Sequence, residues 1–319
     1  MLSLKNYIKS PNRILLGIIT HFPFLFSDKT SLKVQYRIKL GRKLNLTNPK
    51  RYTEKLQWLK LYDRKPEYTT MVDKIAAKEY VASIIGRSHI IPTLGVWNHF
   101  DEIDMCSLPN KFVLKTNHGG GGVGVVICKD KANLDIEKAK NVLERSLKHR
   151  IYPISREWPY KNVKPHILAE PLLENQRVSS DSKTDTKTVS SNDCGIHDYK
   201  FYCFNGIPKV LLIASNRFTT HNFNYFDMDF QPLPITSVDG DPIDYHLIEK
   251  PTMFEEMKSI AKKLSHDLAH VRVDLYEVEG EVFFGELTFY DSSGFDNMNS
   301  DMTDLEWGSW ITLPCDKVL

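Results

Sequence analysis

The stretch HVRVDLYEVEGEVFFGELTF, residues 270–289, has the pattern of two β-strands joined by a tight turn. Successive side chains of a strand point to opposite faces, so Arg272 and Asp274 share one face of the first strand. A three-residue turn would place Asp274 opposite Glu286, and Arg272 opposite Thr288, on the same side of the hairpin. A two-residue turn would instead put the two carboxylates on opposite faces.

Two carboxylates held side by side on this hairpin would need a cation. Cross-strand neighbours are about 5 Å apart, and like charges directly opposite each other are destabilising. Mg²⁺ suits the position because it is a hard ion that takes carboxylate oxygens and substrate phosphates together, and Arg272 could hold a phosphate oxygen beside it. The alternative is a solvent-facing hairpin whose charges only keep the protein soluble. The hairpin alone does not decide between the two.

A second unusual stretch is KTNHGGGGVGVV, residues 115–126, in which Lys115 precedes a run of glycines. Glycine loses more conformational freedom on folding than any other residue, and a hairpin turn needs only one or two glycines at positive φ. The surplus favours a lid whose backbone N–H groups approach phosphate oxygens, with Lys115 adding a charge. No GK[ST] follows the run and no helix opens directly after it, so it is neither a Walker A loop nor a Rossmann turn. The run comprises Gly119, Gly120, Gly121 and Gly122.

Between these two stretches lies HILAEPLLE, residues 166–174, an apolar strand that runs into Glu170. A strand edge with free backbone groups could hydrogen-bond an adenine ring. Leu172 could then border the ring, and Glu174 could reach a ribose hydroxyl. Alone, the segment is an ordinary strand end.

The composition describes a globular chain of 319 residues, long enough for two or three lobes. The five cysteines are odd in number and contain no CxxC pair, so they indicate neither a zinc site nor a disulfide framework. We interpret them as reduced thiols of a cytoplasmic protein.

The charge is unevenly distributed. Residues 1–70 hold 15 Lys and Arg against 4 Asp and Glu, a net charge of +11, which leaves −9 for the rest of the chain. This basic end contains ILLGIITHFPFLF, from Ile14 to Phe26, which is shorter than the roughly 20 apolar residues that span a bilayer. The segment is either a buried N-terminal helix or a peripheral contact with an anionic membrane surface. Nucleic-acid binding is not expected, because no base-reading module accompanies the basic residues.

The remaining segments predict a mixed α+β protein. Residues 46–82 are helix-forming, and from Ile90 onward short strands dominate. Two amphipathic helices interrupt the strands, one capped by Asp135 and one over residues 251–268. Residues 177–193 are polar and of low complexity, which is typical of a mobile surface loop.

The order of these features resembles the ATP-grasp superfamily: a lysine ending a strand, a glycine-rich loop, an apolar strand ending in Glu, a strand with Lys200, then RxD and ExT on a terminal hairpin. More narrowly, whole phrases resemble the TupA-like ATP-grasp family of bacterial surface-polysaccharide clusters, from about Asn48 to the C-terminus. They include NPKRYTEKLQWLKLYDR, VDKIAAKEYV, FVLKTNHGGGG, DYKFYCFNG and VRVDLYEVEGEVFFGELTFYDSSGF. The resemblance implies ATP and Mg²⁺ as cofactors and an ATP-grasp fold, in which two lobes of mainly antiparallel sheet clasp the nucleotide. It also implies three parts: a basic helical region (1–72), an N-lobe with the glycine lid (73–168) and a C-lobe with the hairpin (169–319).

The family's functional residues map onto specific positions. Lys74 and Lys115 match the two lysines that contact ATP phosphates, Glu170 begins the adenine hinge, and Glu174 lies at the ribose position. The metal positions are Asp274, Glu286 and Thr288. The last departs from the family's Asn, and a neutral hydroxyl is a poorer metal ligand than an Asn carbonyl. The catalytic phosphate or carboxylate contacts are Arg272, Lys200 and Arg217.

The function that the resemblance implies is ligation of a carboxylate to an amine through an acyl phosphate. The substrates would be an amino acid or amine and a sugar acid, free or on a lipid-linked glycan. A glycan phosphotransferase and a non-ligase protein of the glycosyl-transferring machinery are the alternatives on the same fold. The stretch SREWPYKNVK, residues 155–164, is either an acceptor-binding loop, through Arg156 and its aromatic side chains, or a packed linker between the lobes.

Overall fold

The computed structural model describes residues 11–120, 122–174, 196–215, 222–235, 242–296 and 300–314. Three of the expectations above lie outside these residues: Gly121, Arg217 and the polar insert at 177–193. The described chain is a mixed α+β protein, as the sequence predicts.

Its helices are α2 (Pro11–His21), α3 (Asp28–Leu40), α4 (Tyr52–Tyr62), α5 (Glu67–Val72), α6 (Ala76–Ile85), α7 (Ile136–Lys148), α8 (Ile151–Ser155), α9 (Phe254–Leu264) and α10 (Asp301–Trp310). Short 3-10 segments are η1 (Pro23–Leu25), η2 (Arg87–His89), η3 (Phe100–Glu102), η4 (Lys131–Asn133), η5 (Trp158–Asn162), η6 (Tyr245–Leu247) and η7 (Asp291–Gly294). The strands are β1 (Gly95–Trp97), β2 (Phe112–Thr116), β3 (Val125–Cys128), β4 (Ile167–Pro171), β5 (Asp198–Phe204), β6 (Ile207–Ser215), β7 (Asn222–Phe226), β8 (His270–Val278) and β9 (Glu281–Thr288).

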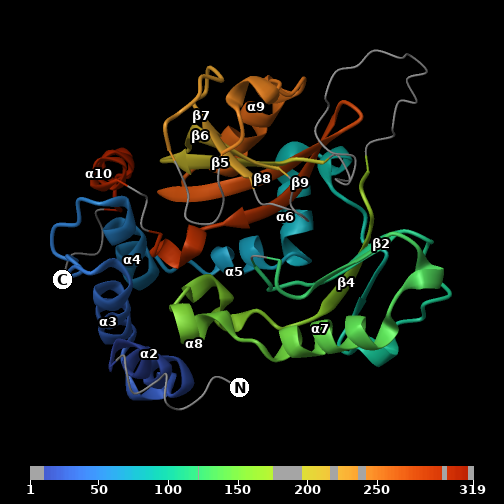
Figure 1. Ribbon diagram of the computed structural model, residues 1–319, viewed down its shortest axis with the longest axis horizontal. Helices are drawn as coiled ribbons and strands as arrows, with labels where there is room; N and C mark the ends of the chain where they lie inside the picture. Colours follow the sequence, from blue (N-terminus) through green and yellow to red (C-terminus); the bar gives the residue numbers. More distant parts are fainter. Residues whose placement is uncertain are drawn as a thin grey trace.

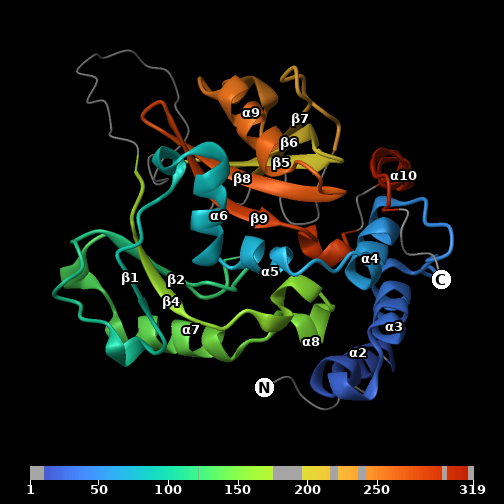
Figure 2. The same ribbon diagram turned by 180° about the vertical axis from the view of Figure 1, so that it is seen from behind.

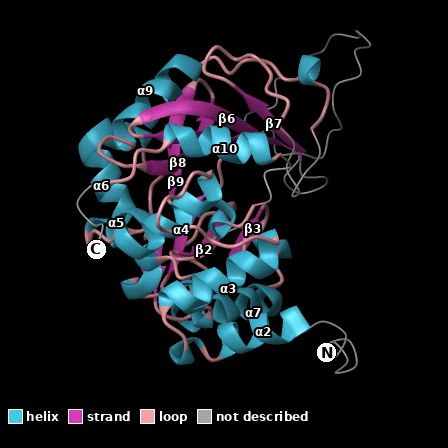
Figure 3. Ribbon diagram, turned by 90° about the vertical axis from the view of Figure 1, so that its left-hand side faces the viewer, coloured by secondary structure: helices cyan, strands magenta, loops and turns pink. Residues whose placement is uncertain are grey.

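These strands form two antiparallel sheets. A four-stranded sheet has the order β1-β4-β2-β3, and a five-stranded sheet has the order β7-β6-β5-β8-β9. Figures 1 and 2 show the five-stranded sheet above the four-stranded one, with α5 and α6 beside them. In Figure 3, α9 and α7 lie at opposite ends of the molecule.

The four-stranded sheet is covered by α7. Buried and half-buried residues alternate along β2, which is the pattern of a strand with one covered face. Asp135 caps α7 by accepting a hydrogen bond from the backbone of Lys138 at 2.9 Å, as expected from the sequence. The buried face of the helix places Leu143 in one core with Leu114.

The five-stranded sheet has the larger core. Its central strands are almost wholly buried because α9 covers one face, where Phe254 packs on Phe201. Tyr52 and Trp307, from α4 and α10, join the same core. The helical segment before residue 73 therefore packs on this sheet. The N-lobe boundary expected between residues 168 and 169 falls inside β4.

The β8–β9 hairpin has the expected pairing but not the expected turn. The register opposes Asp274 to Glu286 and Arg272 to Thr288. However, Val278 pairs with Glu281, so the turn contains two residues, both at positive φ, rather than three. By itself, such a turn would separate the carboxylates onto opposite faces.

A β-bulge at Gly285 restores the predicted pairing. The register shifts by one residue between Asp274 and Leu275, so that Gly285 has no partner across the ladder. A Cβ at this position would lie 3.0 Å from both the Asp274 carbonyl oxygen and the Tyr276 ring, which explains the glycine. The bulge brings Glu286 back to the face of Asp274.

The N-terminal helices pack on the body through α3. Leu32 and Tyr36 are fully buried and contact Phe295. Ser27 caps α3 through a hydrogen bond from Thr30. Of the helices within the described ranges, none has the length and apolarity needed to cross a membrane.

Candidate functional site

The four-stranded sheet contributes a buried carboxylate between two lysines. Glu170 on β4 lies 2.5 Å from Lys115 on β2 and 2.7 Å from Lys78 on α6. Burial alone would raise the pKa of Glu170, but Lys115 and Lys78 outweigh it and hold that pKa below its ordinary value. Lys78 is also fixed by the Ile91 carbonyl and the Thr93 hydroxyl, each at 2.7 Å. The sequence analysis did not single out Lys78, because its partner is 92 positions away in the chain.

The glycine loop joins β2 to β3, as the lid prediction requires. Gly122 and Gly124 have positive φ, and a Cβ on Gly124 would lie 2.1 Å from the Ser146 hydroxyl. A Cβ on Gly119 would lie 2.6 Å from the Val123 carbonyl oxygen. Local structure therefore explains these three glycines.

Gly120 has no such local reason. Its φ is not left-handed, and a Cβ there would meet nothing within 4 Å. The loop is exposed at this point, so its backbone is open to a ligand. Packing within the loop therefore does not require a glycine at position 120.

Lys74 connects the glycine loop to the β8–β9 hairpin. Its ammonium donates to the Gly119 carbonyl at 2.6 Å and lies 2.8 Å from Glu286. The Lys74 backbone is itself held in place, because its N–H donates to the carbonyl of buried Asn117 at 3.0 Å. One side chain thus joins the loop of one sheet to a carboxylate of the other.

The five-stranded sheet contributes a dense group of charges around Asp274. Arg272 donates to both oxygens of Asp274, at 2.7 and 2.8 Å, and Lys200 donates to it at 2.6 Å. Lys200 also lies 2.9 Å from Asp198. Strand pairing explains the contact, since Lys200 on β5 is directly opposite Asp274 on β8.

Glu286 completes this group. Arg272 reaches it at 3.5 Å and reaches the Thr288 hydroxyl at 3.3 Å. Burial alone would raise the pKa of Glu286, but Lys74, Arg272 and Lys200 outweigh it and hold that pKa well below its usual range. The structure therefore brings together the Lys74, Lys200, Arg272, Asp274, Glu286 and Thr288 that the sequence singled out.

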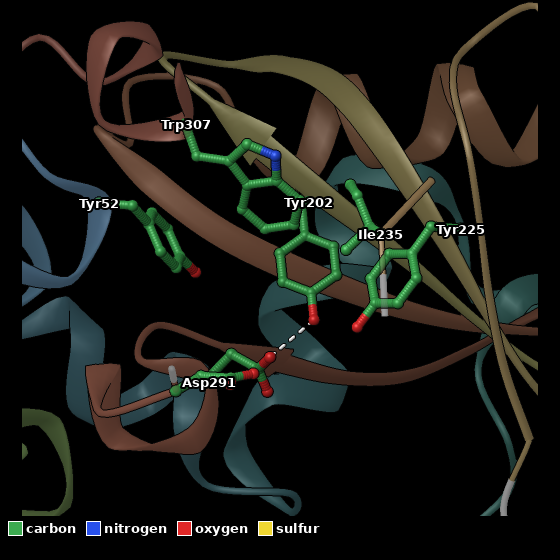
Figure 4. Close-up of a pocket in the computed structure, with 7 residues that line it drawn as sticks. Tyr52, Tyr202, Tyr225, Ile235, Asp291 and Trp307 are labelled. Carbon is green, nitrogen blue, oxygen red and sulfur yellow. Dashed lines mark hydrogen bonds between the residues drawn. The ribbon is translucent and has the colours of Figure 1, made fainter. Parts of the chain in front are cut away.

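Asp291, at the start of η7, is a member of the group that sequence reasoning missed. Its carboxylate accepts hydrogen bonds from Arg272 and, at 2.6 Å, from the Tyr202 hydroxyl. Figure 4 shows Tyr202 pointing down toward Asp291, with the Tyr225 ring beside it. Burial alone would raise the pKa of Asp291, but Arg272 outweighs it and keeps that pKa below its ordinary value.

A pocket opens at this point. Its lining comprises Tyr52, Tyr202, Tyr225, Ile235, Asp291, Asp296 and Trp307. The walls are mainly aromatic, and Asp291 links them to Arg272. Tyr52, Tyr202 and Trp307 are buried and pack against one another, so the pocket is a small gap in the core beside Asp291.

The backbone that carries Asp291 is constrained. Ser292 and Ser293 have φ of 45° and 55°, in the left-handed region that serine rarely adopts. The Ser293 carbonyl accepts hydrogen bonds from Lys60 at 2.7 Å and from Gln57 at 3.1 Å, and its hydroxyl donates to Glu157 at 2.5 Å. Lys60 is fully buried, and burial lowers its pKa to about 7. Side chains of α4 and Glu157, which directly precedes η5, thus hold η7 in a conformation that points Asp291 at Arg272.

The structure bears on the predicted adenine hinge at the edge of β4. β1 pairs with β4 as far as Ala169, so the backbone from Glu170 onward is not paired with β1. This leaves the edge that the hinge hypothesis uses. Leu172 is half-buried beyond it, and Glu174 forms an ion pair with Lys111 at 2.5 Å.

The stretch 155–164 packs as a linker. Arg156 is buried, lies 3.3 Å from Asp28 and donates to the Pro23 carbonyl at 2.7 Å. Trp158 and Tyr160 pack against the large core. Of the two interpretations of this stretch, the structure favours the linker, because Arg156 is already committed to the N-terminal region.

The three predicted metal ligands have the donor chemistry of a magnesium site. Asp274, Glu286 and Thr288 offer the oxygen donors that Mg²⁺ prefers, and Glu286 is the more accessible carboxylate. The part of the chain that the structure describes contains no group of three His, Cys, Asp or Glu placed to bind a metal ion. The donors therefore fit Mg²⁺ only as part of a set that nucleotide phosphates would complete.

Two antiparallel sheets, a glycine loop between strands and a charged hairpin facing it together define an ATP-grasp protein. More narrowly, the chain belongs to the TupA-like ATP-grasp family, which it matches over residues 54–312. The family expected from the sequence is thereby confirmed.

Several solved structures contain chains that are similar to this one. The D-alanine-D-alanine ligase of Helicobacter pylori is 17% identical, with 82% of this chain and 69% of that chain covered and a TM-score of 0.41. A D-cycloserine synthetase is 15% identical, with 75% and 69% covered and a TM-score of 0.40. The D-alanine–D-alanine ligase of Bacillus anthracis complexed with ATP is 14% identical, with 75% and 65% covered and a TM-score of 0.39. A comparison with curated proteins finds no match.

Proposed function

We propose that the protein is an ATP-dependent ligase that joins a carboxylate to an amine through an acyl phosphate. The observation that carries the proposal is Lys74, which contacts the Gly119 carbonyl of the glycine loop and Glu286 of the hairpin at once. A nucleotide triphosphate entering between these elements would meet Lys74, Lys115 and the exposed loop backbone. Membership of the ATP-grasp family supports the same assignment.

The charged groups suit the two steps of such a reaction. In the first, an oxygen of the substrate carboxylate attacks the γ-phosphorus and ADP leaves. In the second, the amine attacks the acyl carbon and phosphate leaves. Lys74 and Lys115 would bind the phosphates, and Arg272 would bind the transferred phosphoryl oxygens, so that developing negative charge is neutralised in both steps. Mg²⁺, held by Asp274 and Glu286, would add the charge neutralisation that phosphoryl transfer needs.

The acceptor is proposed to be a sugar acid of a surface polysaccharide. The position of Arg272 supports this class, because its guanidinium, which already binds the Asp274 carboxylate, could hold the carboxylate of a substrate. The resemblance to the polysaccharide-cluster family points to the same substrates, with an amino acid or other amine as the second partner. Asp291 could accept a hydrogen bond from a sugar hydroxyl.

The test measures ADP and free phosphate with ATP, Mg²⁺ and pairs drawn from uronic acids and amino acids. A ligase releases both products only when both substrates are present. Carboxylate labelled with ¹⁸O should pass one labelled oxygen to phosphate, since the C–O bond breaks when the amine attacks. Release of ADP without free phosphate would identify a phosphotransferase instead. Absence of any ADP with every pair would favour a non-catalytic protein on the same fold.

A matched pair of variants locates the activity. Glu286→Gln should reduce turnover at least 100-fold while keeping most of the thermal shift caused by Mg·ATP, because Lys115 and the loop still bind phosphate. Glu281→Gln, at the exposed far end of the same strand, should leave turnover unchanged. Equal losses in the two variants would mean that the hairpin acts only through stability.

A further inference from the structure

The N-terminal segment presents an apolar surface to solvent. Six large apolar side chains within twelve residues are exposed on α2 and η1, and Phe24 and Leu25 are 80% and 62% exposed. Exposed patches of this kind mark interaction sites. The six, hereafter the apolar patch, are Ile14, Leu15, Ile18, Phe22, Phe24 and Leu25.

The patch is a continuous face. Ile14 and Ile18 are four residues apart and therefore lie along one side of α2, and Phe22 follows directly after the end of the helix. The Phe22 ring packs edge-on against Phe24, with 6.3 Å between the ring centroids, which joins the helix face to η1. Ile19, on the other side of the helix, is fully buried.

The body of the protein holds this face outward. Asp28, directly after the segment, accepts hydrogen bonds from Arg64 at 2.6 Å and Tyr152 at 2.8 Å. Arg156 donates to the Pro23 carbonyl at 2.7 Å. The backbone of η1 is thus fixed from behind while its apolar side chains remain exposed.

The helix beside the patch is basic. The helix α3 contains Lys29, Lys33, Arg37 and Lys39 and a single acid, Asp28. Asp28 is itself paired with Arg64 and Arg156. Exposed Lys29, Lys33 and Arg37 follow one another at four-residue intervals along α3, which packs beside α2.

We infer that the apolar patch and the basic row of α3 dock the protein on a bilayer surface that carries anionic headgroups. Apolar side chains flanked by cations are the chemistry that such an interface binds. The eleven residues of α2 span about 16 Å, far less than a bilayer core, so the segment lies on the surface. A second copy of the chain is a poorer occupant, because a two-fold contact would bring the basic row of α3 close to its own copy. The inference is independent of the proposed ligase activity. Figure 3 shows α2 at the end of the molecule opposite α9.

The experiment is co-sedimentation of the full chain, without nucleotide, with vesicles of phosphatidylcholine alone or with 30% phosphatidylglycerol. Binding is expected only with the anionic lipid, and it should fall as salt rises, because screening shortens the reach of surface charges. Lys29→Gln/Lys33→Gln/Arg37→Gln should weaken binding by up to about 100-fold, from about fivefold for each charge. Phe24→Ser/Leu25→Ser should weaken it at least tenfold, and Phe24→Trp should show a blue shift in emission when vesicles are added.

The matched control is Leu247→Ser/Met302→Ser, which removes two exposed apolar side chains elsewhere on the surface and should leave binding unchanged. Thermal melts would check that each variant is folded. Three results would overturn the inference: no binding to anionic vesicles, an equal loss in the control, or a change in oligomeric mass of Phe24→Ser/Leu25→Ser in the absence of lipid. The last would identify a second copy of the chain as the occupant.

Discussion

The ion pair between Lys115 and Glu170 allows structural and ligand-binding roles of one lysine to be separated. The Glu170 side chain is only 6% exposed, and its two oxygens are divided between Lys115 and Lys78. Replacing Lys115 by Met keeps the aliphatic stem but removes one of the two cations. A buried carboxylate then depends on Lys78 alone.

The magnitude follows from burial. Removing one partner of a buried ion pair destabilises by about 3–5 kcal/mol when the remaining charge is left uncompensated. Because Lys78 stays in place, we expect Lys115→Met to lower the free energy of unfolding by about 2–3 kcal/mol. The double variant Lys115→Met/Glu170→Gln should recover most of this loss, since Lys78 keeps its hydrogen bonds to the Ile91 carbonyl and the Thr93 hydroxyl.

The assay is urea unfolding of the wild type and the two variants, with the thermal shift caused by Mg·ATP measured on the same samples. Stability should return in the double variant, but the shift should not, because the phosphate-binding charge is still missing. The control is Lys111→Met, which removes an equally short pair with Glu174 at 2.5 Å but at a position where the lysine side chain is 52% exposed. It should change stability by no more than about 1 kcal/mol. A similar loss in Lys115→Met and Lys111→Met, or recovery of the nucleotide shift in the double variant, would refute the reasoning.

Three further predictions concern the loop, the bulge and buried Lys60. Gly120→Ala should keep stability within about 0.5 kcal/mol but weaken Mg·ATP binding measured by calorimetry, whereas Gly124→Ala should lower the melting temperature, because its Cβ would lie 2.1 Å from a hydroxyl. Gly285→Val should destabilise by about 1–3 kcal/mol in urea unfolding and reduce turnover, because it crowds the backbone of Asp274. The pKa of Lys60 is lowered to about 7, so between pH 7 and the ordinary lysine value near 10.5 the unfolded chain binds more protons and stability rises with pH. Lys60→Met should lose this rise. Between pH 7.5 and pH 9.5, the free energy of unfolding measured in urea should rise by about 2–3 kcal/mol more in the wild type than in the variant.

The hairpin shows how far local sequence can predict this site. Alternation correctly placed Asp274 opposite Glu286, but the reasoning assumed a longer turn than the protein has. The two-residue turn alone would put the carboxylates on opposite faces. The bulge at Gly285 adds one residue to β9 and so restores the pairing that a three-residue turn would give. Glycine inside a strand is a recognised signal for a bulge. A search for that signal could have found Gly285, although not the compensating turn.

The missing members of the site have no local signal. Lys78 reaches Glu170 because α6 packs beside the four-stranded sheet, and Asp291 reaches Arg272 because Lys60 and Glu157 hold η7 in place. Each contact joins residues that are distant in sequence or depends on a backbone conformation that composition does not encode. The family phrases predicted the fold, and only packing could add these neighbours.

The cations around the hairpin change the argument for magnesium. From the sequence, two adjacent carboxylates demanded an external cation, but Lys74, Lys200 and Arg272 already meet that demand. With Lys78 and Lys115 included, the site contains five bases and five acids, so it has no surplus positive charge for a nucleotide that carries four negative charges. The bases are Lys74, Lys78, Lys115, Lys200 and Arg272, and the acids are Glu170, Asp198, Asp274, Glu286 and Asp291. A lysine that turned to a phosphate would leave its carboxylate with fewer cationic partners: Glu170 would keep only Lys78 without Lys115, and Glu286 would keep only Arg272 without Lys74. Weakening the pairing of a buried charge is costly. A divalent cation bound with the nucleotide would offset both deficits, since it would neutralise phosphate oxygens and give the carboxylates another partner. The argument for Mg²⁺ as a proposed cofactor therefore rests on this charge balance rather than on the carboxylate pair alone.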